Sequence, residues 1–112
     1  MIDLGYLHGT VTFNDLSTLD NVDVQDQLDA LKEDLLQVQY PQNLLIDVGW
    51  YPEFCADGAF RVYVIQHEQW HSPCAQIHAN SLQTLEQGLR EAQATVERII
   101  GNADHGTPPW TP

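Results

Sequence analysis

Basic residues are scarce in this chain of 112 residues. Four lysines and arginines face sixteen aspartates and glutamates, which gives a formal net charge of −12. A surface this acidic repels the phosphates of nucleic acids and anionic lipid headgroups, so we expect neither a nucleic-acid nor a membrane partner. The charge either attracts a basic protein partner or only keeps the chain soluble.

Cysteines and long apolar runs are also lacking. The two cysteines, Cys55 and Cys74, are too few for a disulfide framework. No apolar run approaches the roughly 20 residues that a membrane-spanning helix needs. Residues 1–13 contain no basic region followed by an apolar segment, so we expect no signal peptide. These absences predict reduced thiols in a cytoplasmic protein.

Alternating and continuous apolar patterns predict the strands. Residues 5–13 and 59–66 alternate as half-buried strands do, and residues 43–51 are apolar almost throughout, as in a central strand. Residues 74–79 form a short further strand. Asp57-Gly58 is a turn signal between the predicted strands 43–51 and 59–66.

A helical period predicts two helices. The first runs from about Asp23 to Pro41, with Asn21 or Asp23 as N-cap. Its apolar stripe consists of Val24, Leu28, Leu31, Leu35 and Val38. The second begins after Ser81 as N-cap and ends with Gly101 at the C′ position.

The predicted order is therefore β-α-β-β-β-α. It corresponds to an α+β, two-layer sandwich with a mostly antiparallel sheet and both helices on one face. We expect a single domain over residues 1–101 and a Pro-rich C-terminal tail over residues 102–112.

The segment HEQWH, residues 67–71, matches the zincin motif H-E-x-x-H. That motif needs a helix, because one turn brings both imidazoles to the same zinc ion. Here it follows the strand-like residues 59–66 and is closed by Pro73, so we expect a polar connection between strands. His67, His71 and Cys74 together remain an alternative metal site if the loop is tight.

No other residues indicate an enzyme. Asp47 lies in the apolar run 43–51, where a carboxylate satisfied by backbone donors or an arginine is the expected structure. The chain has no G-x-S-x-G motif and no phosphate-binding glycine loop. We therefore expect no catalytic residues, no metal and no cofactor.

Aromatic residues are concentrated between residues 50 and 70. Alternation sends Trp50 and Tyr51 to opposite faces of the sheet, and helices cover only one face. Some of these rings should therefore be exposed beside the acidic residues, as in a protein-binding surface. A second ring layer covered by the tail or by a twin subunit is the alternative.

The stretch from Ile46 to Pro73 carries a family pattern. I-D-x-G-W-Y-P-E, a D-G turn, F-x-V-x-V-I and W-x-x-P follow one another. This pattern resembles small bacterial immunity proteins of contact-dependent inhibition and polymorphic toxin systems. The resemblance implies a cytoplasmic, non-enzymatic protein that binds one toxin domain and blocks its active site or substrate path.

Charge agrees with that resemblance, because toxins that cleave nucleic acids tend to be basic and an acidic inhibitor gains on-rate by steering. We expect an immunity protein that occludes a cognate, basic toxin domain, such as a nuclease. A homodimeric structural subunit and a small metal-binding protein are the alternatives. The expected partner-binding residues are Asp20, Asp23, Asp26, Asp29, Glu33, Asp34, Trp50, Tyr51, Glu53, Asp57, Glu68 and Trp70.

Overall fold

Five strands and one long helix make up the regular structure of the residues described below. The computed structural model describes residues 4–20 and 22–104. The elements are β1 (Thr10–Asn14), β2 (Leu36–Tyr40), β3 (Leu44–Tyr51), β4 (Ala59–Gln66), β5 (Ala75–Ala79) and α1 (Leu82–Asp104). Three single 3-10 turns lie between β1 and β2, namely η1 (Leu16–Thr18), η2 (Val24–Asp26) and η3 (Leu28–Ala30).

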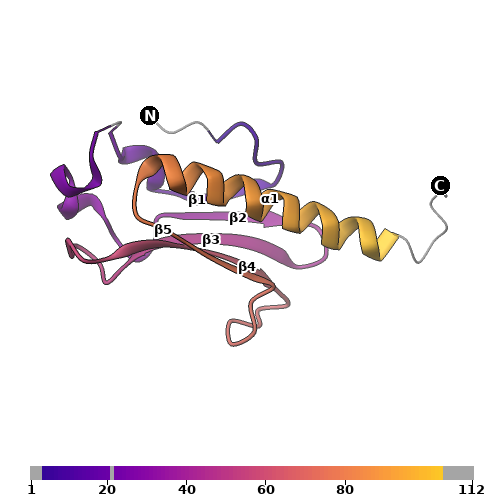
Figure 1. The fold of residues 1–112 in the computed structure, drawn as a ribbon. Coiled ribbons are helices and arrows are strands. Elements are labelled where there is room, and N and C mark those ends of the chain that lie inside the picture. Colours follow the sequence, from indigo (N-terminus) through magenta and orange to yellow (C-terminus); the bar gives the residue numbers. More distant parts are fainter. Residues whose placement is uncertain (1–3, 21, 105–112) are drawn as a thin grey trace.

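The strands form one antiparallel sheet in chain order, β1-β2-β3-β4-β5 (Figure 1). The α+β class and the antiparallel sheet are as predicted. The predicted strands 43–51, 59–66 and 74–79 correspond to β3, β4 and β5, because their apolar patterns match the register that buries one face.

The predicted helix between Asp23 and Pro41 is wrong. Residues 24–30 form η2 and η3, and the end of the segment is strand β2. Residues of the predicted apolar stripe are still buried in the core. Val24 and Leu31 lie in or next to the short turns, and Val38 lies in strand β2. The sequence LQVQY in β2 alternates buried and more exposed positions, a strand signal that the longer helical period overrode.

The first strand is shorter than predicted. β1 begins at Thr10 instead of Gly5, and its register shifts between Val11 and Phe13. This irregularity ends the simple alternation, so Val11 pairs with Val38 and Phe13 pairs with Gln37 on opposite faces. The preceding residues cross toward α1 instead of continuing the sheet.

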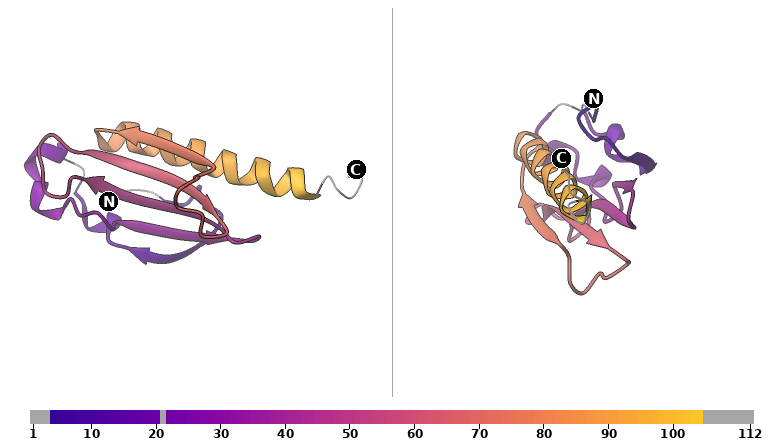
Figure 2. Two further views of the ribbon diagram at one scale, coloured as in Figure 1. Left: turned by 90° about the horizontal axis from the view of Figure 1, so that it is seen from below. Right: turned by 90° about the vertical axis from the view of Figure 1, so that its right-hand side faces the viewer.

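The last helix begins where predicted and ends later. The Ser81 hydroxyl accepts a hydrogen bond from the Thr84 backbone N–H at 3.1 Å, which is the expected N-cap contact. The helix continues through Gly101 to Asp104, so Gly101 is not its C′ residue. Residues 105–112 of the predicted tail lie outside the described ranges. Figure 2 shows α1 running diagonally along the sheet and extending past its end.

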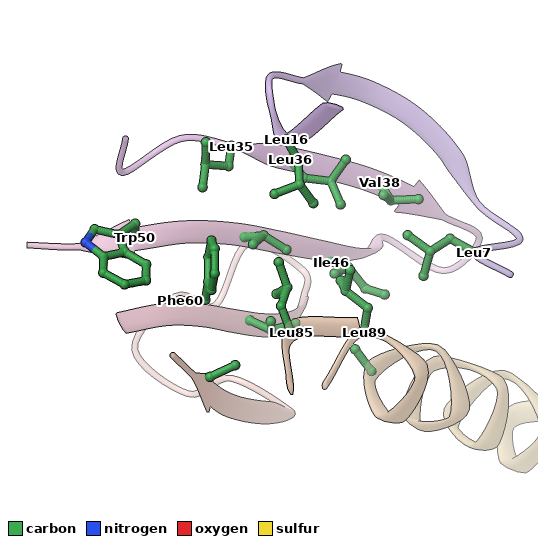
Figure 3. Close-up of a cluster of buried hydrophobic side chains, with 14 of the residues drawn as sticks. Leu7, Leu16, Leu35, Leu36, Val38, Ile46, Trp50, Phe60, Leu85 and Leu89 are labelled. Carbon is green, nitrogen blue, oxygen red and sulfur yellow. The ribbon is translucent and has the colours of Figure 1, made fainter. Parts of the chain in front are cut away.

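The core lies between α1 and the sheet. Leu85 and Leu89 of the helix pack in one buried cluster with Ile46, Val48 and Val62 of the central strands (Figure 3). At one end of this cluster Trp50 contacts Phe60 edge to face, with ring centroids 4.9 Å apart. Aromatic pairs in this geometry stabilise a core beyond the area that they bury.

The opposite face of the sheet carries no helix. Strand pairing places Phe13, Gln37, Asp47 and Tyr63 in one row across it, with Arg61 in the next row. We call this the helix-free face. Figure 1 shows that the connection between β4 and β5 projects from the sheet on this side, away from α1.

Candidate functional site

Eight carboxylates gather at the end of the sheet where β3 ends and β4 begins. They come from the turns before β2 and from the loop of residues 52–58, and all are exposed. The same two segments contain one basic residue, Lys32. We call this surface the acidic end; its carboxylates are Asp20, Asp23, Asp26, Asp29, Glu33, Asp34, Glu53 and Asp57.

Hydrogen bonds hold the two acidic segments together. Gln25 Nε2 donates to the Ala56 carbonyl at 3.0 Å, and the Phe54 N–H donates to the Leu31 carbonyl at 2.8 Å. The acidic surface that was predicted on a helix is therefore present, but it is not formed by a helix. Turns and a loop, instead of one helix, bring these carboxylates to the same surface.

Local side-chain contacts shape the turns. The Asp23 carboxylate caps η2 by accepting from the Gln25 N–H at 3.0 Å. The buried Gln27 amide accepts from the Asp20 N–H and donates to the Asp20 carbonyl, both at 2.9 Å. Such side-chain bonds to the backbone offer an alternative to helix, which is why this segment turns.

Trp50 is not available to a partner. Its side chain is fully buried on the helix side of the sheet, and its indole Nε1–H donates to the Cys55 carbonyl at 2.9 Å. The prediction that Trp50 is a binding residue is therefore wrong, because the pleat directs it into the core. Phe54 instead is the exposed ring of the acidic end, with 49% of its surface accessible.

Tyr51 lies at the border of the acidic end on the helix-free face. The Arg61 guanidinium stacks on its ring, 5.1 Å from the centroid. Burial first, and then the charges of Asp47, Asp34 and Glu33, raise the pKa of its hydroxyl. Tyr51 is therefore a half-buried residue that lies between the exposed carboxylates of the acidic end and the helix-free face.

Glu68 and Trp70 lie at the other end of the sheet. Both are exposed in the connection between β4 and β5, and 47% of the Trp70 surface is accessible. The eight residues of β4 place roughly 23 Å between its two ends, at about 3.3 Å per residue. The structure thus separates these two predicted binding residues from the acidic end.

HEQWH is a turn and loop, as its position after a strand predicted. His67 and Glu68 both have positive φ, and the Gln69 N–H donates to the Gln66 carbonyl at 3.1 Å. Across residues 4–20 and 22–104, no three His, Cys, Asp or Glu side chains lie together as a metal-ion cluster. His67, His71 and Cys74 are thus not brought together as ligands.

Asp47 is the most buried acidic side chain of the helix-free face, with only 5% of its surface accessible. Its Oδ1 accepts a hydrogen bond from Gln37 Nε2 at 3.1 Å, so the expected backbone or arginine partner is replaced by an amide. Burial raises the pKa of this carboxyl, the Gln37 bond opposes that effect, and the charge of Asp34 adds to it.

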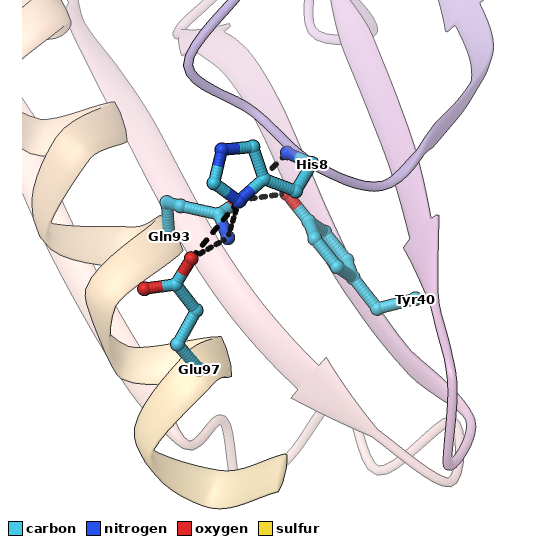
Figure 4. Close-up of polar contacts among 4 residues, drawn as sticks. All are labelled: His8, Tyr40, Gln93 and Glu97. Atoms are coloured by element: carbon cyan, nitrogen blue, oxygen red, sulfur yellow. Dashed lines mark hydrogen bonds and ion pairs between the residues drawn. The ribbon is translucent and has the colours of Figure 1, made fainter. Parts of the chain in front are cut away.

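A separate polar cluster joins the N-terminal segment to α1 (Figure 4). The buried Gln93 accepts from the His8 N–H at 3.1 Å and from the Tyr40 hydroxyl at 2.6 Å. Its amide donates to Glu97 at 2.9 Å, and the His8 ring lies 3.0 Å from the same carboxylate. These contacts satisfy one another, so we interpret the cluster as structural.

Comparison with protein-family models, with curated proteins and with solved structures finds no match for this chain. Within the described ranges, no helix combines the length and the apolarity that crossing a bilayer requires.

Proposed function

We propose that this chain is a cytoplasmic immunity protein that binds a cognate, basic toxin domain and blocks it without chemistry of its own. The observation that carries the proposal is the acidic end, where the two segments with eight exposed carboxylates also present the exposed ring of Phe54. An apolar anchor inside a charged rim is the usual anatomy of a protein-binding surface. The family resemblance of residues 46–73 points to the same class of protein.

The two basic residues near the acidic end, Lys32 and Arg61, contact residues outside its eight carboxylates. Lys32 Nζ lies 3.0 Å from Asp15, and Arg61 stacks on Tyr51. Most of the negative charge of the acidic end is therefore left to an external partner. Such a field accelerates association with a basic protein and repels acidic competitors.

The charge also argues against the homodimer that is the alternative. A dimer through the helix-free face with its twofold axis near Asp47 would bring Asp34 and Asp47 of one copy toward the same residues of the other. Like charges in an interface cost several kcal/mol unless they are paired. We therefore do not propose a structural subunit that assembles through this face.

The test is to express the C-terminal domain of the protein encoded beside this gene, alone and together with this chain. We expect the domain to arrest growth and the chain to restore it by forming a complex. An unchanged arrest with no complex at micromolar concentrations would overturn the proposal, as would a neighbouring product that does not arrest growth.

Matched charge reversals test the role of the acidic end. Asp26→Lys should lower the association rate about tenfold at low salt and weaken its salt dependence, within the range that steering accounts for. Glu91→Lys makes the same change in charge on α1 and should have a small effect. Equal effects of both variants would show that only the net charge matters.

A further inference from the structure

A cavity of about 260 Å³ opens on the helix-free face beside the acidic end. Phe13, Gln37 and Asp47 line it from three adjacent strands, and Asp34 lines it from the segment before β2. Its volume lies below the about 300–1,000 Å³ that is typical of sites for drug-sized ligands. The cavity therefore suits one side chain better than a cofactor.

Asp47 gives the cavity its chemistry. The carboxyl group is almost fully buried, its Oδ1 accepts a hydrogen bond from Gln37 Nε2, and the residue lines the cavity. An ionised carboxylate that is withdrawn from bulk water is stabilised most by a charged hydrogen-bond donor. A cationic donor that enters the cavity would therefore stabilise the ionised form of Asp47.

A second carboxylate at the cavity also favours a cationic group there. Asp34 lies at the same cavity and is exposed, and the ion pairs of the described residues include neither of these carboxylates. Arg61 shares the face but stacks on Tyr51. The described residues therefore do not neutralise the pair Asp34 and Asp47.

We propose that this cavity receives an arginine side chain of the protein partner. The guanidinium would donate to the carboxylates of Asp47 and Asp34, with its plane against the ring of Phe13. The inference rests on the proposed function, since it names the group by which a basic partner is recognised.

Arginine fits this site better than lysine for three reasons. Its planar guanidinium offers five donors and can serve two carboxylates at once, whereas an ammonium is a point charge. It stacks on aromatic rings, and Phe13 presents a ring that is 39% accessible at the cavity. It is also less strongly hydrated, so entering a half-closed cavity costs less.

The probe for a first test is N-acetyl-argininamide, titrated into the isotopically labelled protein by NMR. We expect saturable shifts of the backbone amides of Gln37 and Asp47, with N-acetyl-lysinamide at least about threefold weaker. Asp47→Asn should weaken binding at least about tenfold, while Glu91→Gln, which removes one charge from α1, should leave it unchanged. Shifts spread over the whole acidic end, or equal binding by Asp47→Asn, would overturn the proposal.

Asp47→Asn is a clean variant because asparagine keeps the volume and can still accept the bond from Gln37. Its fold is checked by the same spectra. The toxin complex provides the second test, in which Asp47→Asn should increase the dissociation rate about tenfold or more.

The two proposals can fail separately. Binding of the arginine probe at Asp47 without any toxin complex would retain the cavity and remove the immunity function. A toxin domain that binds Asp47→Asn as tightly as the natural chain would retain the immunity function and remove the arginine site.

Discussion

The carbonyl group of Glu33 lies against Gly49 so closely that a Cβ atom on residue 49 would overlap the carbonyl oxygen. Two hydrogen bonds flank this contact, from the Trp50 N–H to the Lys32 carbonyl and from the Leu35 N–H to the Val48 carbonyl. The chain before β2 is thereby held along β3. Glu33 and Asp34 can lie beside the helix-free face because residue 49 is a glycine, which has no Cβ atom to displace the Glu33 carbonyl.

Gly49→Ala should therefore destabilise the fold by about 3 kcal/mol or more, because the obstacle is backbone and cannot rotate away. Urea unfolding followed by circular dichroism measures the change. Gly101→Ala is the control, since a Cβ there meets nothing within 4 Å and a helix favours alanine by about 0.5–1 kcal/mol. A Gly49→Ala variant as stable as the natural chain would contradict the contact.

Asp47→Asn should raise the stability of the unliganded protein at neutral pH. The folded-state pKa of Asp47 is raised, so its ionisation opposes folding. Its contribution to stability is fully present below the unfolded pKa of 3.8 and is lost as pH rises through the higher folded value. The variant should therefore melt at a higher temperature than the natural chain at pH 7.

Melting temperatures of Asp47→Asn and the natural chain at low pH test whether ionisation of Asp47 opposes folding. The difference in melting temperature between Asp47→Asn and the natural chain should shrink as pH approaches 3.8. Glu91→Gln removes one charge from an exposed helix position and should show a smaller difference at pH 7. A gain for Asp47→Asn that is independent of pH would contradict the assigned cause.

Tyr40→Phe should cost about 1 kcal/mol, because it removes the hydroxyl that donates to Gln93 at 2.6 Å. Burial raises the pKa of Tyr40 to about 12, while a hydrogen bond with the Gly9 backbone lowers it and Glu97 raises it. Its contribution is present below the unfolded value of 10 and is lost as pH rises through about 12. Absorbance of tyrosinate near 295 nm follows the titration.

Tyr63→Phe is the matched control, since Tyr63 lies on the other face of the sheet and outside this cluster. It should change stability by less than the Tyr40 variant. Ionisation of Tyr40 near pH 10 in the folded protein would contradict its burial.

Trp50→Phe should destabilise by about 2–3 kcal/mol, because it leaves a cavity and leaves the Cys55 carbonyl without its donor. Trp70→Phe should stay within about 0.5 kcal/mol, since Trp70 is exposed in a loop. Chemical unfolding of both variants measures the contrast. Equal losses would place Trp50 at the surface and restore it as a binding residue.

The strands were predictable where one pattern acts alone. Residues 59–66 alternate, and β4 has those bounds because a single register buries Phe60, Val62 and Val64. The segment before β2 was not predictable in this way. Its apolar spacing is compatible with a helix as well as with turns followed by a strand. Long-range contacts, such as that of Gly49 with Glu33, favour the turns and the extended chain.

The candidate site was predictable in its charge and not in its geometry. The carboxylates are visible in the sequence, but that Glu53 and Asp57 share a surface with Asp26 depends on the bond from Gln25 to Ala56. Alternation correctly separated Trp50 from Tyr51, yet no local signal says which of the two faces the helix. The approach of Gln37 to Asp47 follows only from the register of β2 with β3.

The chain-order meander has a consequence for how the molecule closes. Each strand pairs with its immediate successor, and the hairpins from β2 to β5 close across short connections at little cost in loop entropy, whereas the long segment 15–35 separates β1 from β2. The bond from His8 to Gln93 joins residues 85 positions apart. This last closure is the one that the local hairpins cannot supply, so we expect the N-terminal segment and α1 to separate before the sheet does when the protein opens.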